Sequence, residues 1–126
     1  TRAAAPVLAD GGRIIFIGSQ LGTRVPWPGA ADYAGSKAAL IGYAYGVARD
    51  LGRRNITANV VQPGIMPTDM KTAVLGDSVP DALLDTHAIR RIATLGEVAA
   101  TVCFLAGPAA GYITGSVIDV AGGIGI

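Results

Sequence analysis

The sequence predicts a three-layer α/β fold, in which a parallel sheet of about three strands lies between helices. A continuous apolar run at 13–18 is typical of a strand that is buried on both faces of a parallel sheet, and residues 56–61 are expected to form a second strand. Between them, residues 31–53 repeat apolar side chains at the period of an amphipathic helix. A strand, a helix and a strand in this order favour a right-handed parallel connection.

The first half of the chain is expected to contain four segments. Residues 1–9 are predicted to be the last turns of a helix, which an Asp-Gly-Gly sequence stops. The strand at 13–18 comes next, and a proline-containing loop at 22–29 leads into the helix at 31–53. This helix is the longest element that the pattern predicts.

The second half of the chain repeats the alternation of strand and helix. The strand at 56–61 ends at a Gln-Pro-Gly sequence, and a variable segment at 65–92 contains short helical stretches. A second amphipathic helix is predicted at 96–106, and a third strand at 116–120 precedes a glycine-rich tail.

Composition and charge indicate one small folded domain. The chain has 126 residues, of which 51% are hydrophobic and 15% are charged, and this excludes a disordered chain. The net charge is +1, and the densest basic cluster, Arg49, Arg53 and Arg54, has no interleaved aromatic side chains. Such a balance argues against nucleic acid binding.

Cysteine usage and hydropathy indicate the cellular compartment of the protein. The single cysteine, Cys103, excludes a disulfide within the chain and is predicted to be a small core thiol in a reducing compartment. One cysteine and one histidine also cannot form a metal site. Neither a signal peptide nor an apolar run of the ~18 residues that a membrane span needs is found. We therefore expect a cytoplasmic protein without a membrane partner.

One pair of residues carries the chemistry of proton transfer. Tyr33 and Lys37 are four residues apart in the predicted helix, so their side chains share one face and lie about 5–6 Å apart at Cβ. A phenol ionises too little near neutral pH to act as a base unless a cation lies beside it. The pair therefore predicts an acid–base site that works on an oxygen atom, and Ser19 ends the strand upstream of it.

Five motifs in register point to a known family. They are Gly18-Ser19, Tyr33-Ala-Gly-Ser-Lys37, Asn59-Val-Val-Gln-Pro63-Gly64 with Thr68, Tyr112-Ile-Thr-Gly115, and Gly122-Gly123. Their order and spacing resemble the C-terminal half of the classical short-chain dehydrogenases/reductases, especially the ketoacyl reductase-like members. The resemblance runs from the first residue to the last. It implies a Rossmann-like fold, of which residues 1–126 would be the C-terminal half of a doubly wound sheet, as a single domain.

The resemblance implies a catalytic set. Tyr33 would be the general acid or base on the oxygen of a small carbonyl or secondary alcohol substrate. Lys37 would supply the cation and would also bind the nicotinamide ribose, and Ser19 would hydrogen-bond the substrate carbonyl. The alternative for Ser19 is a hydroxyl that caps the local backbone at the end of the strand.

The resemblance also implies a cofactor, NAD or NADP. Pro63 and Gly64 end a strand at the carboxyl edge of the sheet, where open α/β folds place their ligands. The backbone near Ile65 and the hydroxyl of Thr68 would meet the nicotinamide carboxamide. The alternative for Thr68 is the cap of a short helix that begins at Asp69.

Part of the family pattern is not found in these residues. The family begins with a glycine-rich turn that binds the pyrophosphate, a residue that selects the adenosine ribose, and a catalytic asparagine. We therefore read 1–126 as a domain whose N-terminal cofactor-binding half is absent, and we expect weak NAD or NADP affinity from these residues alone. Ala121 also departs from the family, which usually has an acidic residue there.

The missing half predicts an open sheet edge. In the family, the strand that matches 13–18 has a second neighbour, so here one apolar edge would lie unpaired. We therefore expect a homo-oligomer that pairs through the 13–18 edge or the 31–53 helix, or a partner chain that carries the other half.

The remaining features are interpreted as structural. His87 is predicted to be a surface residue, and Arg90-Arg91 a solvated pair before the second helix. The glycine-rich 122–125 segment has no helix after it, so it does not meet the requirement for a dinucleotide-binding turn. Trp27 either lines a substrate entrance or anchors an exposed loop.

Three functions stay open at this level. The first is an NAD(P)-dependent oxidoreductase that uses Tyr33 as its acid or base. The second is a cofactor-independent, esterase-like hydrolase that uses Ser19, Tyr33 and Lys37, although the chain contains no G-x-S-x-G sequence. The third is a non-catalytic fragment that associates with itself. We expect the first.

Overall fold

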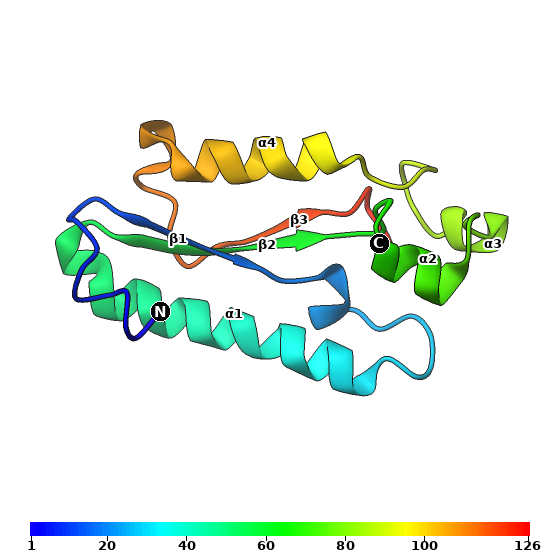
Figure 1. Cartoon of the computed structure of the whole chain (residues 1–126), viewed down its shortest axis with the longest axis horizontal. Coiled ribbons are helices and arrows are strands. Elements are labelled where there is room, and N and C mark those ends of the chain that lie inside the picture. Colours follow the sequence, from blue (N-terminus) through cyan, green and yellow to red (C-terminus); the bar gives the residue numbers. More distant parts are fainter.

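Three layers make up the structure, a computed structural model that describes residues 1–126. Figure 1 shows the sheet between helix α1 (Ala31–Leu51) on one face and helix α4 (Leu95–Ala106) on the other. The strands run parallel in the order β1-β2-β3, so the predicted three-layer α/β fold is confirmed.

The central strand forms the core of the sheet. β2 (Thr57–Pro63) pairs with β1 (Arg13–Ile17) on one side and with β3 (Val117–Val120) on the other. All seven residues of β2 are buried, whereas those of β1 are half-buried or exposed. The full burial predicted for the 13–18 strand is found in β2 instead, because β2 has a neighbour on each edge and a helix on each face.

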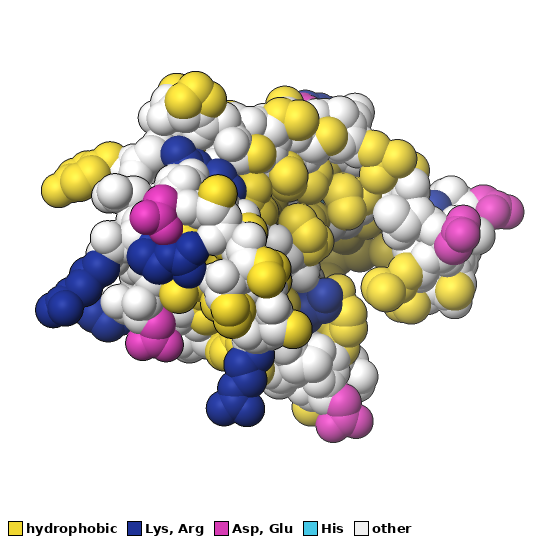
Figure 2. Space-filling view, turned by 60° about the vertical axis from the view of Figure 1, so that its left-hand side comes forward, with side chains coloured by type: hydrophobic (Ala, Val, Ile, Leu, Met, Phe, Trp, Pro, Cys, Tyr) yellow, Lys and Arg dark blue, Asp and Glu magenta, His cyan; other side chains and the backbone are white.

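β1 is the edge strand of this sheet. Its only strand neighbour is β2, and the last β1 residue, Ile17, is 48% exposed although it is apolar. Figure 2 shows a hollow in the molecular surface with hydrophobic side chains gathered in it. The edge that the sequence predicted to be unpaired thus has no neighbour within this chain.

Helix α1 ends slightly before its predicted limit. Small side chains face the sheet, with Ala34, Ala44 and Val47 buried. The last predicted turn instead forms the short 3-10 helix η2 (Gly52–Arg54), which stops at Asn55 with φ 55°. Asparagine is among the few residues other than glycine that adopt this left-handed conformation readily.

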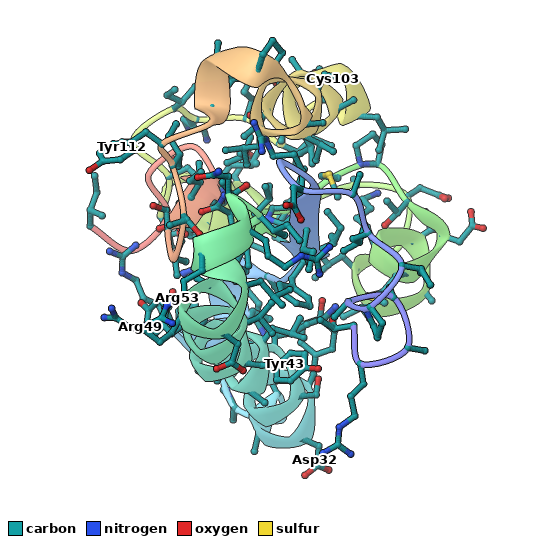
Figure 3. All side chains as sticks on the ribbon, turned by 90° about the vertical axis from the view of Figure 1, so that its left-hand side faces the viewer. Asp32, Tyr43, Arg49, Arg53, Cys103 and Tyr112 are labelled. Atoms are coloured by element: carbon teal, nitrogen blue, oxygen red, sulfur yellow. The ribbon has the colours of Figure 1, made fainter.

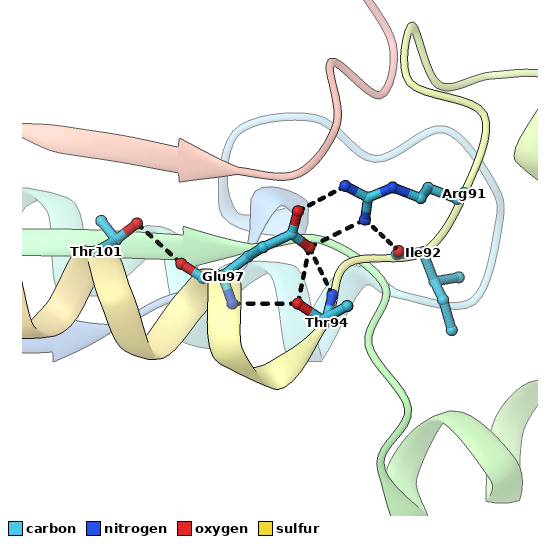
Figure 4. Close-up of polar contacts among 5 residues, drawn as sticks. All are labelled: Arg91, Ile92, Thr94, Glu97 and Thr101. Carbon is cyan, nitrogen blue, oxygen red and sulfur yellow. Dashed lines mark hydrogen bonds and ion pairs between the residues drawn. The ribbon is translucent and has the colours of Figure 1, made fainter.

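Helix α4 begins at a complete capping box. The Thr94 hydroxyl accepts a hydrogen bond from the Glu97 N–H, and the Glu97 carboxylate accepts one from the Thr94 N–H at 2.8 Å. Arg91 binds the same carboxylate at 2.6 Å, as Figure 4 shows. The hydrogen bonds from Arg91 and Thr94 lower the pKa of Glu97 to about 2.

The variable segment contains two short helices. α2 (Asp69–Leu75) and α3 (Asp81–Leu84) lie beyond the carboxyl ends of the strands (Figure 1). Two further 3-10 turns, η1 (Gln20–Gly22) and η3 (Pro108–Ala110), follow β1 and α4.

The prediction of a helix at 1–9 is wrong. The segment forms turns, in which the Leu8 N–H donates to Ala4 and the Ala5 N–H to Thr1, but Pro6 has no N–H to continue the ladder. Arg54 binds carbonyl oxygens of this segment instead, including that of Ala5 at 2.7 Å, and pairs with Asp10.

The prediction of a core thiol at Cys103 is also wrong. Cys103 is exposed on α4, and Figure 3 shows it at the periphery of the molecule together with Tyr112. The sheet-facing positions of α4 are occupied by Val98 and Leu105, which are buried. Because α4 is apolar on nearly all sides, its sequence does not tell which side faces the sheet. None of the helices is both long enough and apolar enough to cross a membrane.

Candidate active site

All the predicted site residues line one cleft at the carboxyl ends of β1 and β2. The cleft has a volume of about 740 Å³. The predicted residues among its lining are Ser19, Tyr33, Lys37, Pro63, Gly64, Ile65 and Thr68. Residues that are far apart in the sequence, from Ser19 to Thr68, thus meet in one place, where parallel α/β sheets bind ligands.

Tyr33 and Lys37 lie close together on α1. The Lys37 ammonium is 5.6 Å from the centroid of the Tyr33 ring, and both side chains are half-buried. The same ammonium donates a hydrogen bond to the carbonyl of Ile17 at 3.3 Å, which ties the first turns of α1 to the end of β1. The two side chains thus lie on one face of α1, as the spacing of the pair predicted.

Ser19 both caps the backbone and lines the cleft. Its Oγ accepts a hydrogen bond from the Leu21 N–H at 3.2 Å, which makes it the N-cap of η1. Its hydrogen can still be donated into the cleft, because a hydroxyl has one donor besides its acceptor lone pairs. Just before it, a Cβ on Gly18 would lie 2.8 Å from Val60, so the glycine lets the chain pass close to β2.

Gly64 packs against Ala121 at the end of β2. A Cβ on Gly64 would lie 2.8 Å from the Cα of Ala121, and the Gly64 N–H donates to the Val120 carbonyl at 3.0 Å. Ala121 is buried, so the departure from the family pattern places a small side chain at a tight contact. The Pro63-Gly64 turn is therefore set by the packing of β2 against the C-terminal tail.

Thr68 is the N-cap of α2. Its Oγ1 accepts a hydrogen bond from the Lys71 N–H at 3.2 Å, so the capping alternative is confirmed. Thr68 lines the cleft as well, and so does Lys71, whose ammonium donates to the carbonyl of Gly76 at 2.7 Å. Two lysines thus line the cleft, one from α1 and one from α2.

Sequence reasoning missed much of the lining. The missed residues come from η1, the loop before α1, α2 with the loop before it, and the C-terminal tail, and most of them are apolar: Gln20, Leu21, Pro28, Gly29, Ala30, Met66, Met70, Lys71, Val74, Leu75 and Ile124. Trp27 lines the cleft too, in agreement with one of its two interpretations. No motif marked these side chains in the sequence, because the loops that connect the elements decide which of them reach the cleft.

The prediction that His87 is a surface residue is wrong. Its exposed fraction is 7%, and its Nδ1 lies 3.0 Å from the Leu83 carbonyl, which makes Nδ1 the donor nitrogen. The imidazole is covered by the C-terminal tail, where a Cβ on Gly122 would lie 3.6 Å from the ring. The neighbouring Arg90 and Arg91 are exposed, but both form ion pairs, Arg90 with Asp81 and Asp85 and Arg91 with Glu97.

The comparison with protein families agrees with this geometry. A family model described as enoyl-(acyl carrier protein) reductase matches residues 1–125. The chain belongs to the short-chain dehydrogenase/reductase family. The resemblance seen in the five motifs is thereby confirmed, and so is the Rossmann-like fold class.

Individual relatives are similar in sequence over nearly the whole chain. The cyclic-di-GMP-binding biofilm dispersal mediator protein of Escherichia coli is 47% identical over 122 residues, which cover 97% of this chain and 51% of that protein. The 3-oxoacyl-[acyl-carrier-protein] reductase MabA of Mycobacterium tuberculosis is 46% identical over 117 residues, which cover 91% of this chain and 46% of that protein.

A solved structure has a similar fold. The crystal structure of a blue fluorescent protein from a metagenomic library, in complex with NADPH, has a TM-score of 0.91 at 42% identity. The matched region covers 99% of this chain and 50% of the blue fluorescent protein chain. The chain therefore spans about half the length of the proteins it matches.

Proposed function

We propose that residues 1–126 form the acid–base half of an NAD(P)-dependent oxidoreductase, which reduces a carbonyl or oxidises a secondary alcohol. The observation that carries this proposal is the meeting of Ser19, Tyr33 and Lys37 in one cleft at the carboxyl edge of the sheet. Two relatives support it, since one is named a 3-oxoacyl reductase and one was solved with NADPH.

The cleft fits the nicotinamide end of such a cofactor. Its lining supplies two hydrogen-bond donors, the Lys37 ammonium and the Thr68 hydroxyl. The ribose hydroxyls and the carboxamide of a nicotinamide cofactor can accept hydrogen bonds from such donors. Backbone at Pro63, Gly64 and Ile65 lines the cleft beside them, and the apolar side chains supply surface for a planar ring. When bound, the nicotinamide donates or accepts a hydride.

The chain's own residues would handle the proton and the oxygen. In reduction, Tyr33 would donate its phenolic proton to the substrate oxygen, and in oxidation it would take that proton back. Ser19 would donate a hydrogen bond to the same oxygen and stabilise its developing charge. Lys37 would supply a positive charge beside the tyrosine, because its ammonium lies 5.6 Å from the ring centroid.

The cofactor's pyrophosphate and adenosine would be bound elsewhere. We propose that 1–126 is the C-terminal half of a longer fold and that a glycine-rich cofactor-binding half lies beside β1. A homo-oligomer is a second part of this proposal, with the β1 edge or the α1 helix, where Tyr43 and Tyr45 are each about half exposed, as the contact. Either arrangement would cover apolar surface that β1 leaves open.

A pair of tyrosine variants on α1 tests the proposed chemistry. Tyr33→Phe removes the hydroxyl inside the cleft, and Tyr45→Phe removes one from a side chain that is 52% exposed and does not line the cleft. We expect ketone-dependent NADPH oxidation by the purified protein to fall at least about 100-fold in Tyr33→Phe alone. Unchanged turnover in Tyr33→Phe would contradict the mechanism.

The hydrolase alternative is tested with the same protein. If ester hydrolysis proceeds without NAD or NADP and disappears in Ser19→Ala, the oxidoreductase proposal is wrong. In the structure, the hydrogen bond at Ser19 Oγ comes from the Leu21 N–H. An activated serine would instead need a base at its hydroxyl.

A further inference from the structure

The glycine-rich tail has a role in the structure other than binding a phosphate. Gly122, Gly123 and Gly125 all have positive φ angles, of 61°, 71° and 71°. This left-handed backbone folds the tail back on itself, and the Ile124 N–H donates to the Ala121 carbonyl at 3.2 Å. As a result Ile124 is 1% exposed, whereas Ile126, two residues later, is 85% exposed.

The folded tail is joined to the segment that follows α3. The Ile89 N–H donates to the Gly122 carbonyl at 2.9 Å, and the Gly125 N–H donates to the Thr86 carbonyl at 3.1 Å. We call this pair of segments, 86–89 and 122–125, the clasp. His87 lies inside the clasp and is buried there.

The clasp is closely packed at one point. A Cβ on Gly123 would lie 2.8 Å from the Cβ of Ala88, which is closer than two carbon atoms approach without a shift of the backbone. Any side chain at 123 would thus separate the two segments. A glycine is required there both for its φ angle and for this contact.

Ile124 is the residue of the clasp that lines the cleft. It lines the cleft together with Ser19 and Tyr33, and with apolar side chains of α2 such as Leu75. Because the tail is held by the 86–89 segment, the position of Ile124 in the cleft depends on the clasp. Only 1% of Ile124 is exposed, so its side chain fills the wall of the cleft, and a shorter side chain would leave a cavity there that a longer substituent could enter.

We propose that Ile124 is a specificity-determining residue, which limits the length of the apolar substituent on the carbonyl substrate, and that the clasp holds it in place. This inference rests on the proposed function, because it concerns the same cleft. It adds a residue from the C-terminal tail to a site that the motifs assign to β1, α1 and β2.

Binding of straight-chain methyl ketones tests the role of Ile124 without turnover. Trp27 is the only tryptophan of the chain and lines the same cleft, so quenching of its fluorescence reports binding. The shorter side chain in Ile124→Ala should tighten the binding of the longer ketones about tenfold, which corresponds to ~1.4 kcal/mol from the added apolar burial. The binding of the shortest ketone should not change. The matched control, Ile126→Ala, should bind every ketone as the parent protein does.

Two outcomes would overturn this part of the proposal. One is the same dependence on ketone length in Ile124→Ala as in the parent, and the other is an equal change in Ile126→Ala. Should Ile124→Ala fail to fold by circular dichroism, Ile124→Val gives the same test with a smaller change. Failure of the proposed function has a different signature, since ketones would still quench Trp27 while Tyr33→Phe would not affect NADPH oxidation.

Hydrogen exchange tests the clasp itself. Gly123→Ala should increase the exchange rate of the Ile89 amide at least about tenfold, because left-handed strain and the contact with Ala88 both open the clasp. Gly11→Ala is the control, since Gly11 has φ 78° and no heavy atom near its Cβ position. Equal exchange at Ile89 in Gly123→Ala and the parent would disprove the clasp, and so would ketone binding that is unaffected by Gly123→Ala.

Discussion

Two groups of side chains line the cleft, and their positions are set in different ways. The motif group, Ser19, Tyr33, Lys37, Pro63 and Gly64, stands at the ends of β1 and β2 and on the first turns of α1. The apolar group, Met66, Met70, Val74, Leu75 and Ile124, comes from α2 with the residues before it and from the C-terminal tail.

The difference between the groups lies in what holds them. Strand register and helical periodicity position the motif group, and both are visible as spacings along the chain. The apolar group is positioned by loops, by the cap at Thr68 and by the clasp. The sheet and α1 thus carry the proposed chemistry, while α2, its preceding loop and the tail shape the space for the substrate.

The largest expected effect separates the two lysines of the cleft. Lys37 belongs to the motif side and Lys71 to the α2 side, and both line the cleft. Lys37→Ala should lower ketone turnover about 100-fold, because the phenol of Tyr33 loses the cation beside it. Lys71→Ala should change turnover less than about threefold, since its ammonium is bound to the carbonyls of Gly76 and Asp77. Equal losses in steady-state rate would remove the distinction between the groups.

The next effect concerns the packing that holds the motif group. Gly64→Ala should lower the free energy of unfolding by about 1–3 kcal/mol, because its Cβ would lie 2.8 Å from the backbone of Ala121. Gly46→Ala is the control on α1, where no heavy atom lies within 4 Å of the Cβ position. It should raise stability by up to about 1 kcal/mol, as alanine does in a helix. Urea unfolding of both variants measures these changes, and a stable Gly64→Ala would contradict the close packing.

The smallest expected effect concerns Glu97 in the first turn of α4. The Glu97 carboxylate has a pKa of about 2, below its ordinary value, because of Arg91 and Thr94. A lowered pKa contributes stability that is present above about pH 4.3 and is lost as the pH falls toward 2. Because Glu97 is exposed, this contribution is expected to be small.

Urea unfolding at about pH 6 and at about pH 2 measures the contribution of Glu97. Glu97→Gln should lower the unfolding midpoint at the higher pH only, and so should depend less on pH than the parent protein. Asp77→Asn, which removes an exposed carboxylate without an ion pair, is the control and should follow the parent. If Glu97→Gln keeps the full pH dependence, the network in Figure 4 does not contribute to stability.

Errors in the sequence predictions fall where local pattern and tertiary contact disagree. Cys103 was predicted to be buried because its neighbours are apolar, but α4 has only one side against the sheet. His87 was predicted to be exposed because it lies in the variable segment, but the tail covers it. In both cases burial depends on which segment packs opposite the residue, and a single stretch of sequence does not contain that information.

The sequence by itself determined the alternation of strands and helices, the family and the spacing of Tyr33 and Lys37. These follow from local periodicity and from covalent distances along the chain. The tertiary structure alone decided that His87 is buried, that Cys103 is exposed, and that Ile124 lies in the wall of the cleft. The physical reason is that such contacts join segments far apart in the chain, and packing selects among conformations that local interactions leave nearly equal in energy.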